Sequence, residues 1–322
     1  MSQRIQNLLR ALLSVALLGF VLRQADLRHA AATLLQADPV PLLLAFGLYQ
    51  IGVGIRAFRW QTLLASLGIE APLRRLWSLY LIGTFYSQVL PSGIGGDVVR
   101  MVELSAESGR ATAVVSSTVV DRFTGLFVLF LIALGALPFS FRLVPVELAT
   151  AIVVVTAGTV VGTMLLLYRP LLRWLRRAVP FVGWIVDRPQ VRAMYETLHR
   201  YTAAALLRAC AASLAFNVLL IAGVYLLALA LGIRISPWYF LLFVPIVSFS
   251  LVLPISISGL GVREGTFVFL FTQAGVAAPQ ALALSFAYYA VTLATGLIGG
   301  AVHALQGALG LRSGREDATR ES

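Results

Sequence analysis

Long apolar runs, separated by short polar segments, fill most of the chain. Six of the runs have enough length, or nearly enough, to cross the hydrocarbon layer of a bilayer as a helix, which takes ~20 residues. These six are Ile5–Leu22, Val40–Phe58, Ala111–Leu137, Leu148–Tyr168, Ala203–Leu231 and Gln280–Leu309. The pattern therefore predicts an all-α fold, a polytopic helical bundle in a membrane.

Two further apolar regions are interrupted in the middle by glycine and proline. The first consists of Leu76–Leu90 and Val98–Glu107, and the second of Tyr239–Leu253 and Val262–Gln273. Each half is shorter than the ~20 residues that a span needs, and a broken backbone at membrane depth is tolerated only where protein buries it or where it lines a wet cavity. We therefore expect two re-entrant elements, for about eight membrane segments in all.

Arginines are concentrated in three segments that are expected to lie on one side of the membrane. These segments are 56–75 (with Arg56, Arg59, Arg74 and Arg75, between the second and third apolar runs), 169–208 and 312–320. Cytoplasmic loops carry the excess of arginine, and all three segments are cytoplasmic if the two broken regions are hairpins that enter from opposite sides. This predicts a multi-pass protein of the cell membrane with both termini in the cytoplasm. Eight complete helices stay open as the alternative.

The two interruptions resemble each other in sequence. Val-Leu-Pro precedes each of them, at 89–91 and at 252–254, and Ser-Gly-x-Gly occurs at 92–95 and at 258–261. An arginine and an acidic residue lie close by in both halves. A weak internal match in opposite orientation is typical of inverted-repeat transporters, whose binding site lies where the broken helices meet. Chance similarity between two apolar stretches is the alternative.

The interruptions combine features that suit an anionic ligand. Glycines let the backbone turn and expose N–H groups, and a helix that begins after the turn offers partial positive charge. Arginine adds paired donors that match a phosphate. The predicted substrate-binding residues are Ser92, Gly93, Gly95, Gly96, Asp97, Arg100, Asp121, Arg122, Ser258, Gly259, Gly261, Arg263 and Glu264.

Four of the charged candidates have alternative roles. Asp97 is placed to cap a helix that begins at Val98, or to pair with an arginine until a substrate displaces it, and Glu264 allows the same two interpretations. Asp121 and Arg122 lie well inside an apolar run, where charges are costly and usually face the bundle interior. Neighbours on a helix point about 100° apart, so each is expected to pair elsewhere, either at a binding cavity or in a structural ion pair.

Two weaker candidates lie in the run from Ala203 to Leu231. Asn217 is placed to hydrogen-bond a neighbouring helix. Arg208 is close enough to the end of the run to extend its charge to the membrane surface.

Composition agrees with the pattern and excludes several classes of function. Of the 322 residues 59% are hydrophobic and 12% charged, and the net charge of +11 comes from arginine alone. Because these arginines lie between apolar runs, we expect them to face lipid headgroups rather than nucleic acid. One cysteine and three scattered histidines predict no metal site, and no cofactor motif is present. We expect one membrane domain, 1–310, with a cytoplasmic or interfacial loop at 169–202 and a disordered polar tail at 311–322.

Three motifs resemble those of the lysylphosphatidylglycerol synthase transmembrane family, also called flippase-like membrane proteins. They are Leu90–Arg100, the pair Asp121-Arg122, and Ser258–Gly265, and the resemblance covers about residues 5 to 310. In larger family members, the resemblance implies, this region moves aminoacylated phosphatidylglycerol across the bilayer, and a separate cytosolic domain attaches the amino acid. Only a short segment follows Leu309 here, so we do not expect lysyl transfer.

The sequence thus favours a lipid translocase that binds an anionic headgroup at its paired broken helices. The lipid is an anionic phospholipid or a polyprenyl phosphate. The alternative is the membrane component of a lipid-modifying transferase, acting in phosphatidylglycerol aminoacylation or a polyprenyl-phosphate sugar pathway with a soluble transferase partner. A non-catalytic membrane scaffold is the third interpretation.

Overall fold

The computed structural model describes residues 27–90, 95–140, 145–167, 188, 195–198, 200–252 and 256–308. Within these residues all regular structure is helical, which confirms the all-α prediction. The predicted first span at 5–22, most of the predicted loop at 169–202 and the tail at 311–322 lie outside the described residues.

Among the described residues, five helices are long and apolar enough to cross a membrane. They are α3 (Pro39–Ser66), α6 (Ala111–Ser140), α7 (Val146–Leu167), α11 (Ala203–Ala230) and α14 (Ala278–Ala308). They match five of the six predicted spans, and the chain is therefore a polytopic helical membrane protein. A short helix, α2 (Leu27–Leu35), precedes them.

The end of α3 corrects one expectation from the sequence. The helix continues to Ser66 instead of ending near Phe58, so Arg56 and Arg59 lie inside it and not in a cytoplasmic loop. Its last two turns are stabilised by burial, since the side chain of Trp60 and those of its neighbours in the helix pack into the core. The two arginines that interrupt the apolar run are thus part of the helix and point into the protein.

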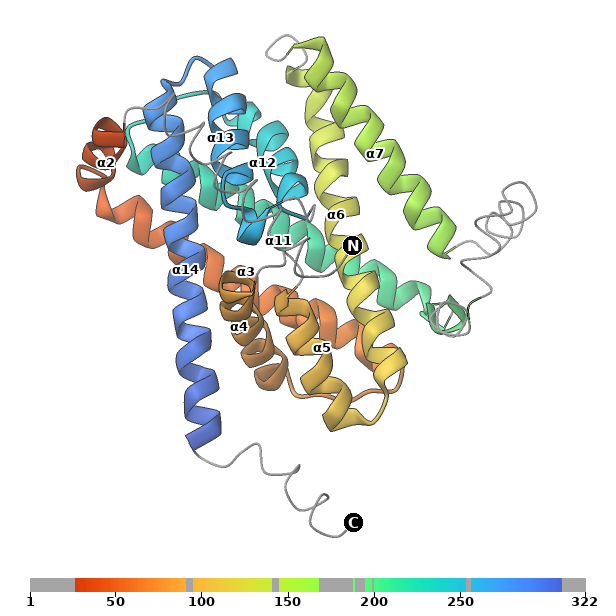
Figure 1. Cartoon of the computed structure of the whole chain (residues 1–322). Helices are drawn as coiled ribbons and strands as arrows, with labels where there is room; N and C mark the ends of the chain where they lie inside the picture. The colour runs from red at the N-terminus through yellow and green to blue at the C-terminus, as the bar shows by residue number, and fades with distance from the viewer. Residues whose placement is uncertain are drawn as a thin grey trace.

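Two pairs of shorter helices occupy opposite halves of the molecule. The first pair is α4 (Leu73–Val89) with α5 (Gly95–Ser108), and the second is α12 (Pro237–Val252) with α13 (Val262–Gln273). Figure 1 shows the first pair in the lower half and the second in the upper half. None of the four helices reaches the ~20 residues of a span.

Helix α14 joins the two pairs. It runs the height of the molecule beside both of them (Figure 1). In its second half Gly299 lies directly against the backbone of Leu81 in α4, and in its first half the ring of Tyr288 contacts that of Phe267 in α13, with centroids 5.9 Å apart. The two pairs are therefore held on one continuous support.

Local sequence signals set several helix ends. Asp38 caps α3 through a hydrogen bond to its side chain from the backbone N–H of Val40, and proline follows at the first helical position. Gly68, Gly232 and Gly275 adopt positive φ just past the ends of α3, α11 and α13. Their N–H groups and those of the next residues bond back to the last helical turn, which closes each helix with a Schellman motif.

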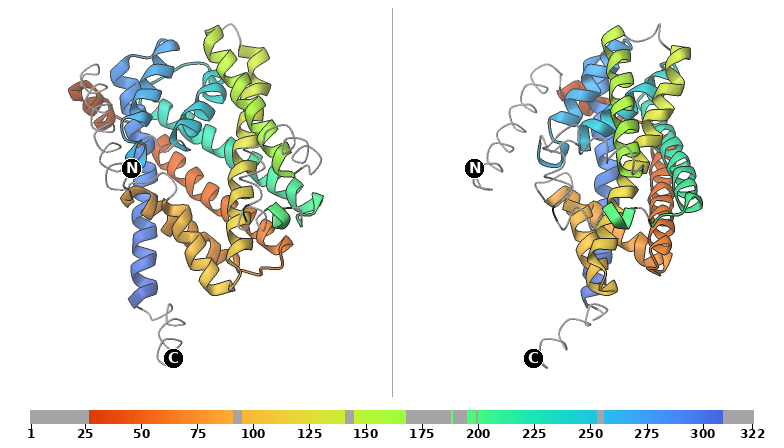
Figure 2. Two further views of the ribbon diagram at one scale, coloured as in Figure 1. Left: turned by 45° about the vertical axis from the view of Figure 1, so that its right-hand side comes forward. Right: turned by 90° about the vertical axis from the view of Figure 1, so that its right-hand side faces the viewer.

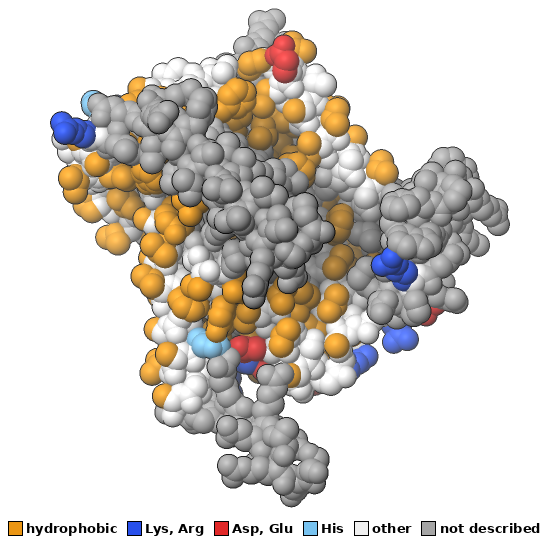
Figure 3. Space-filling view, in the orientation of Figure 1, with side chains coloured by type: hydrophobic (Ala, Val, Ile, Leu, Met, Phe, Trp, Pro, Cys, Tyr) orange, Lys and Arg blue, Asp and Glu red, His pale blue; other side chains and the backbone are white. Residues whose placement is uncertain are grey.

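The outer surface is apolar over most of its height. Large hydrophobic side chains such as Leu43, Phe139 and Leu207 are at least 70% exposed. Figure 3 shows hydrophobic side chains between the two ends of the described surface and charged ones near its margins. Helix α7 lies along the outside of the bundle (Figure 2) and is the least buried of the five long helices. Such a surface is suited to lipid.

Candidate functional site

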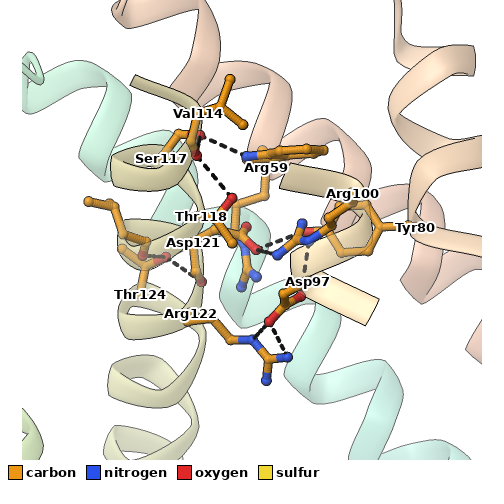
Figure 4. Close-up of polar contacts among 12 residues, drawn as sticks. Arg59, Tyr80, Asp97, Arg100, Val114, Ser117, Thr118, Asp121, Arg122 and Thr124 are labelled. Atoms are coloured by element: carbon orange, nitrogen blue, oxygen red, sulfur yellow. Dashed lines mark hydrogen bonds and ion pairs between the residues drawn. The ribbon is translucent and has the colours of Figure 1, made fainter. Parts of the chain in front are cut away.

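Asp97 links α5 to α6 through two arginines. Its carboxylate accepts a hydrogen bond from Nε of Arg100 at 3.0 Å and another from Nε of Arg122 at 2.5 Å. Figure 4 shows the carboxylate between the two guanidinium groups. Asp97 lies in the first turn of α5, where a negative charge also suits the helix dipole. Of its two predicted roles, pairing with arginine is therefore realised.

Asp121 is the centre of a second, fully buried group. Its carboxylate accepts hydrogen bonds from Nε of Arg59 at 2.6 Å, from the hydroxyl of Tyr80 at 2.6 Å and from Nη2 of Arg100 at 3.2 Å. These partners come from α3, α4 and α5, while Asp121 itself belongs to α6. One carboxylate thus ties four helices together at a point where none of the charges reaches solvent. As expected, Asp121 and Arg122 pair with different partners.

Arg100 is enclosed by aromatic rings. Its guanidinium carbon lies 4.6 Å from the ring centroid of Trp60 and 4.2 Å from that of Tyr80. Its Nη1 is buried and has no hydrogen-bond partner among the described residues. Cation–π attraction supplies part of the stabilisation that water would otherwise give. Arg100 therefore holds the network together from the inside.

The second helix pair carries its own ion pair. Arg263 donates from Nε to the carboxylate of Glu264 at 3.0 Å, and the other oxygen of Glu264 accepts a hydrogen bond from the backbone N–H of Gly261 at 2.7 Å. Glu264 therefore fills both predicted roles, as helix cap and as partner of an arginine. The guanidinium carbon of Arg263 also lies 4.1 Å from the ring centroid of Tyr289 in α14.

The two helix pairs meet where Ser258 contacts the end of α4. The hydroxyl of Ser258 lies 3.1 Å from the carbonyl oxygen of Ser87 and 3.3 Å from that of Gln88, near the end of α4, and donates to them. Ser258, Gly259 and Gly261 all have positive φ. Two of these three positions are glycine, which adopts that conformation without strain, so the Ser-Gly-Leu-Gly string shapes the turn that brings the second pair onto the first.

Two adjoining cavities lie at this meeting point. Their volumes are about 280 Å³ and about 170 Å³, and they share the lining residues Tyr49, Arg56, Ser87, Leu251 and Tyr288. The larger cavity is also lined by Arg59 and Arg122, and the smaller by Ser258 and Arg263. Side chains from both helix pairs therefore border one polar space inside the molecule.

The charges at this space do not balance among the described residues. Four arginines line the cavities, Arg56, Arg59, Arg122 and Arg263, together with one carboxylate, Asp121. With their ion-pair partners behind the cavity wall, Asp97, Arg100 and Glu264, the group has five arginines and three carboxylates, a net charge of +2. Such an excess of positive charge favours the approach of an anion.

Most of the predicted site residues lie in this region. Arg122, Asp121, Ser258, Gly259 and Arg263 line one of the two cavities. Asp97 and Arg100 lie behind the cavity wall, Gly261 and Glu264 shape the start of α13, and Ser92 and Gly93 lie outside the described residues.

Gly95 and Gly96 differ from the prediction. They lie in the first turn of α5 and not in the turn before it. A Cβ atom at Gly96 would overlap the carbonyl oxygen of Gly83 in α4. The glycine is thus required for close approach of the two helices, which explains its presence without a ligand.

Three residues of the site were not identified from the sequence. Arg56 and Arg59 belonged by pattern to a loop, and Tyr80 was one aromatic among many in an apolar run. The spacing of the two arginines, three residues apart in the extension of an apolar helix, is the signal that places both on one face. The two weaker candidates behave as expected, since Asn217 donates to the carbonyl oxygen of Gly125 at 3.0 Å and Arg208 is exposed.

Comparison with known proteins identifies the family. Residues 7–300 match the family described as the lysylphosphatidylglycerol synthase TM region. No curated protein and no solved structure matches the chain. The match covers nearly all of the described helices, including the charged network and both helix pairs. On this evidence the chain belongs to the family of the lysylphosphatidylglycerol synthase transmembrane region.

Proposed function

We propose that the protein is a lipid translocase that binds an anionic headgroup where its two helix pairs meet. The observation that carries this proposal is the space at their meeting point, which is lined by four arginines and one carboxylate among the described residues. A headgroup phosphate would neutralise the excess charge, while the hydrocarbon chains remain in the bilayer. An anionic phospholipid and a polyprenyl phosphate both meet this requirement.

The arrangement of the short helices supports entry of the two pairs from opposite faces. The start of α4 and the end of α5 lie at the end of the molecule where α14 terminates (Figure 1). The start of α12 and the end of α13 lie at the opposite end. Arg74 and Arg75 lie in the first turn of α4, Arg110 donates to the carbonyl oxygen of Gly68 just past α3, and Arg208 borders the same hollow as Ser66 and Pro72. Because these arginines gather at the first of the two ends, we assign it to the cytoplasm of a cell membrane. A cytoplasmic N-terminus then requires the predicted span at 5–22, which lies outside the described residues.

The ion pairs suggest how a headgroup enters the space. The side chain of Arg122 is 34% exposed, whereas its partner Asp97 is 11% exposed. A phosphate that reaches Arg122 takes over one of its hydrogen bonds, while Arg100 continues to neutralise Asp97. Exchange of partners in this way leaves no carboxylate unpaired, which keeps the cost of binding low.

The family description also favours a second function. It names the transmembrane region of a synthase, so the second candidate function is the membrane component of a lipid-modifying transferase with a soluble partner. Its lipid would be phosphatidylglycerol or a derivative of it. The two functions differ in one observable, because only a translocase moves lipid across a bilayer without a partner protein.

Transbilayer movement of a fluorescent phosphatidylglycerol in proteoliposomes tests the proposed function. Dithionite destroys the label in the outer leaflet only, so movement appears as continued loss of signal. Arg122→Gln and Arg263→Gln should each slow it about tenfold or more, because each removes charged hydrogen bonds to the phosphate. Arg74→Gln, an exposed arginine at the start of α4, is the matched control. Unchanged rates in both cavity variants would refute the site, and no movement by the unmodified chain would refute the function.

A further inference from the structure

Arg56 differs from the other arginines around the cavities. Arg59, Arg100, Arg122 and Arg263 each lie within ion-pair distance of a carboxylate. Arg56 has no carboxylate at that distance and no hydrogen bond among the described residues. It lines both cavities and is only partly exposed. Among the described residues it is therefore the arginine of this group that has neither an ion-pair partner nor a hydrogen-bond partner.

Aromatic rings hold Arg56 in place. Its guanidinium carbon lies 4.7 Å from the ring centroid of Tyr80 and 5.4 Å from that of Phe216. Ring contacts of this kind orient the guanidinium but do not occupy its five N–H donors. Since Tyr80 also donates its hydroxyl to Asp121, its ring is fixed by the ion network behind it. Arg56 is thus positioned in advance, with its donors available.

An apolar recess adjoins the two cavities. It lies among α3, α11 and α14, is lined by Gly52, Phe216 and Gly223 among others, and shares Tyr49 and Tyr288 with both cavities. Tyrosine suits such a boundary because it joins an apolar ring to a polar hydroxyl. The recess has a volume of only about 20 Å³, so it takes no more than the first part of a hydrocarbon chain. The ligand that suits this arrangement is an amphiphile with its anion on the polar side.

We infer that Arg56 receives the phosphate oxygens of a lipid whose hydrocarbon begins in the recess between α3 and α11. This inference rests on the proposed function and names the residue that binds the headgroup, which lies outside the three family motifs. A phosphate at Arg56 borders both the cavity that Arg122 lines and the cavity that Arg263 lines. Among the described residues, Arg56 is the one arginine that lines both cavities, so it stays in reach of a headgroup that passes from one to the other.

Native mass spectrometry of the full chain in detergent tests the inference. The protein is titrated with equal amounts of palmitoyl-oleoyl phosphatidylglycerol and phosphatidylcholine, and the bound lipids are counted. Arg56→Gln should lower the apparent affinity for phosphatidylglycerol about tenfold or more and leave that for phosphatidylcholine unchanged. Arg74→Gln should leave both unchanged. Arg56→Lys keeps the charge but loses the paired donors, and it should give an intermediate loss.

The recess is tested with a second pair of variants. Gly223→Leu fills the recess from α11, whereas Gly54→Leu adds the same bulk on α3 where a Cβ atom meets nothing within 4 Å. Only Gly223→Leu should weaken lipid binding. Glycerol 3-phosphate, which carries the anion without hydrocarbon, should not displace the lipid at equal concentration.

The outcomes distinguish an error in the role of Arg56 from an error in the proposed function. If the unmodified chain prefers phosphatidylglycerol and Arg56→Gln retains that preference, the role of Arg56 is wrong and the proposed function stands. If the unmodified chain binds both lipids equally, the proposed function itself is wrong. Displacement by glycerol 3-phosphate, or equal effects of the two leucine variants, would assign the site to a free phosphate instead of a lipid.

Discussion

At the scale of single residues, the buried charges act as a unit that holds four helices. Asp121 receives hydrogen bonds from Arg59, Tyr80 and Arg100, and all of these groups are nearly inaccessible to solvent. Removing one partner from such a group leaves another charge buried and unpaired, which costs more than the pair itself contributes. The network therefore fixes the positions of α3, α4, α5 and α6 around the cavities.

A double-mutant cycle on Asp121 and Arg59 tests this role. Asp121→Leu and Arg59→Met should each lower the free energy of unfolding by about 3–5 kcal/mol, because each strands a buried charge. The double variant should lose less than the sum, since it removes both members of the pair. The measurement is reversible unfolding in mixed micelles, with Arg208→Met as an exposed control that should change stability by no more than about 0.5 kcal/mol. Strict additivity would show that the two residues do not interact.

The sequence indicated part of this network and missed the rest for a physical reason. Asp121 and Arg122 are conspicuous because they interrupt an otherwise apolar run, and charges inside a membrane face the protein interior. Arg56 and Arg59 are less conspicuous, because they lie at the end of an apolar run. Arginines at that position are equally expected in a loop. Which carboxylate pairs with which arginine depends on contacts between α3, α5 and α6, and such contacts leave no trace in local spacing.

At the scale of elements, close helix contacts depend on glycine. Gly96 of α5 lies against the backbone of α4 at Gly83, and Gly299 of α14 lies against the backbone of α4 at Leu81. Small residues at such contacts let helices approach within van der Waals distance in a membrane, where no hydrophobic force drives them together. Helix α4 is therefore contacted closely by a glycine of α5 and by a glycine of α14.

Alanine substitutions in α14 separate packing from helix propensity. Gly299→Ala should destabilise the protein by about 1–3 kcal/mol, because the added methyl group overlaps the carbonyl group of Leu81. Gly307→Ala, in the same helix with nothing within 4 Å of its Cβ position, should be neutral or stabilise by up to about 1 kcal/mol, as helix propensity predicts. Thermal unfolding in detergent measures both. A similar effect at the two positions would contradict the packing role of Gly299.

The broken segments show what local sequence patterns can predict about the elements. The lengths of the apolar runs and the glycine–proline strings predicted all four short helices, with each end within a few residues of the observed one. The start of α5 at Gly95 differs from the expected start at Val98 because close packing against α4, and not the turn, requires Gly96. Local patterns locate a break in a helix, whereas the contact that a glycine serves is set by another part of the chain.

At the scale of the whole molecule, the two helix pairs meet at one point inside an apolar bundle. The contact of Ser258 with the end of α4 joins residues about 170 positions apart in sequence, and the arginine-lined cavities surround it. The resemblance between the two interruptions predicted a shared site. The charge excess there rests largely on Arg56, which only the folded arrangement brings into the site.

The central claim is that lipid passes where the two pairs meet, and a reversible cross-link tests it most directly. In a chain with Cys210→Ser, Ser87→Cys and Ser258→Cys, the thiol at position 258 replaces a hydroxyl that lies 3.1 Å from the backbone carbonyl oxygen of position 87. Oxidation should stop transbilayer movement of fluorescent phosphatidylglycerol, and reduction should restore it in the same vesicles, while a chain with Cys210→Ser and Ser258→Cys alone stays active throughout. Undiminished movement in fully cross-linked protein would contradict the account.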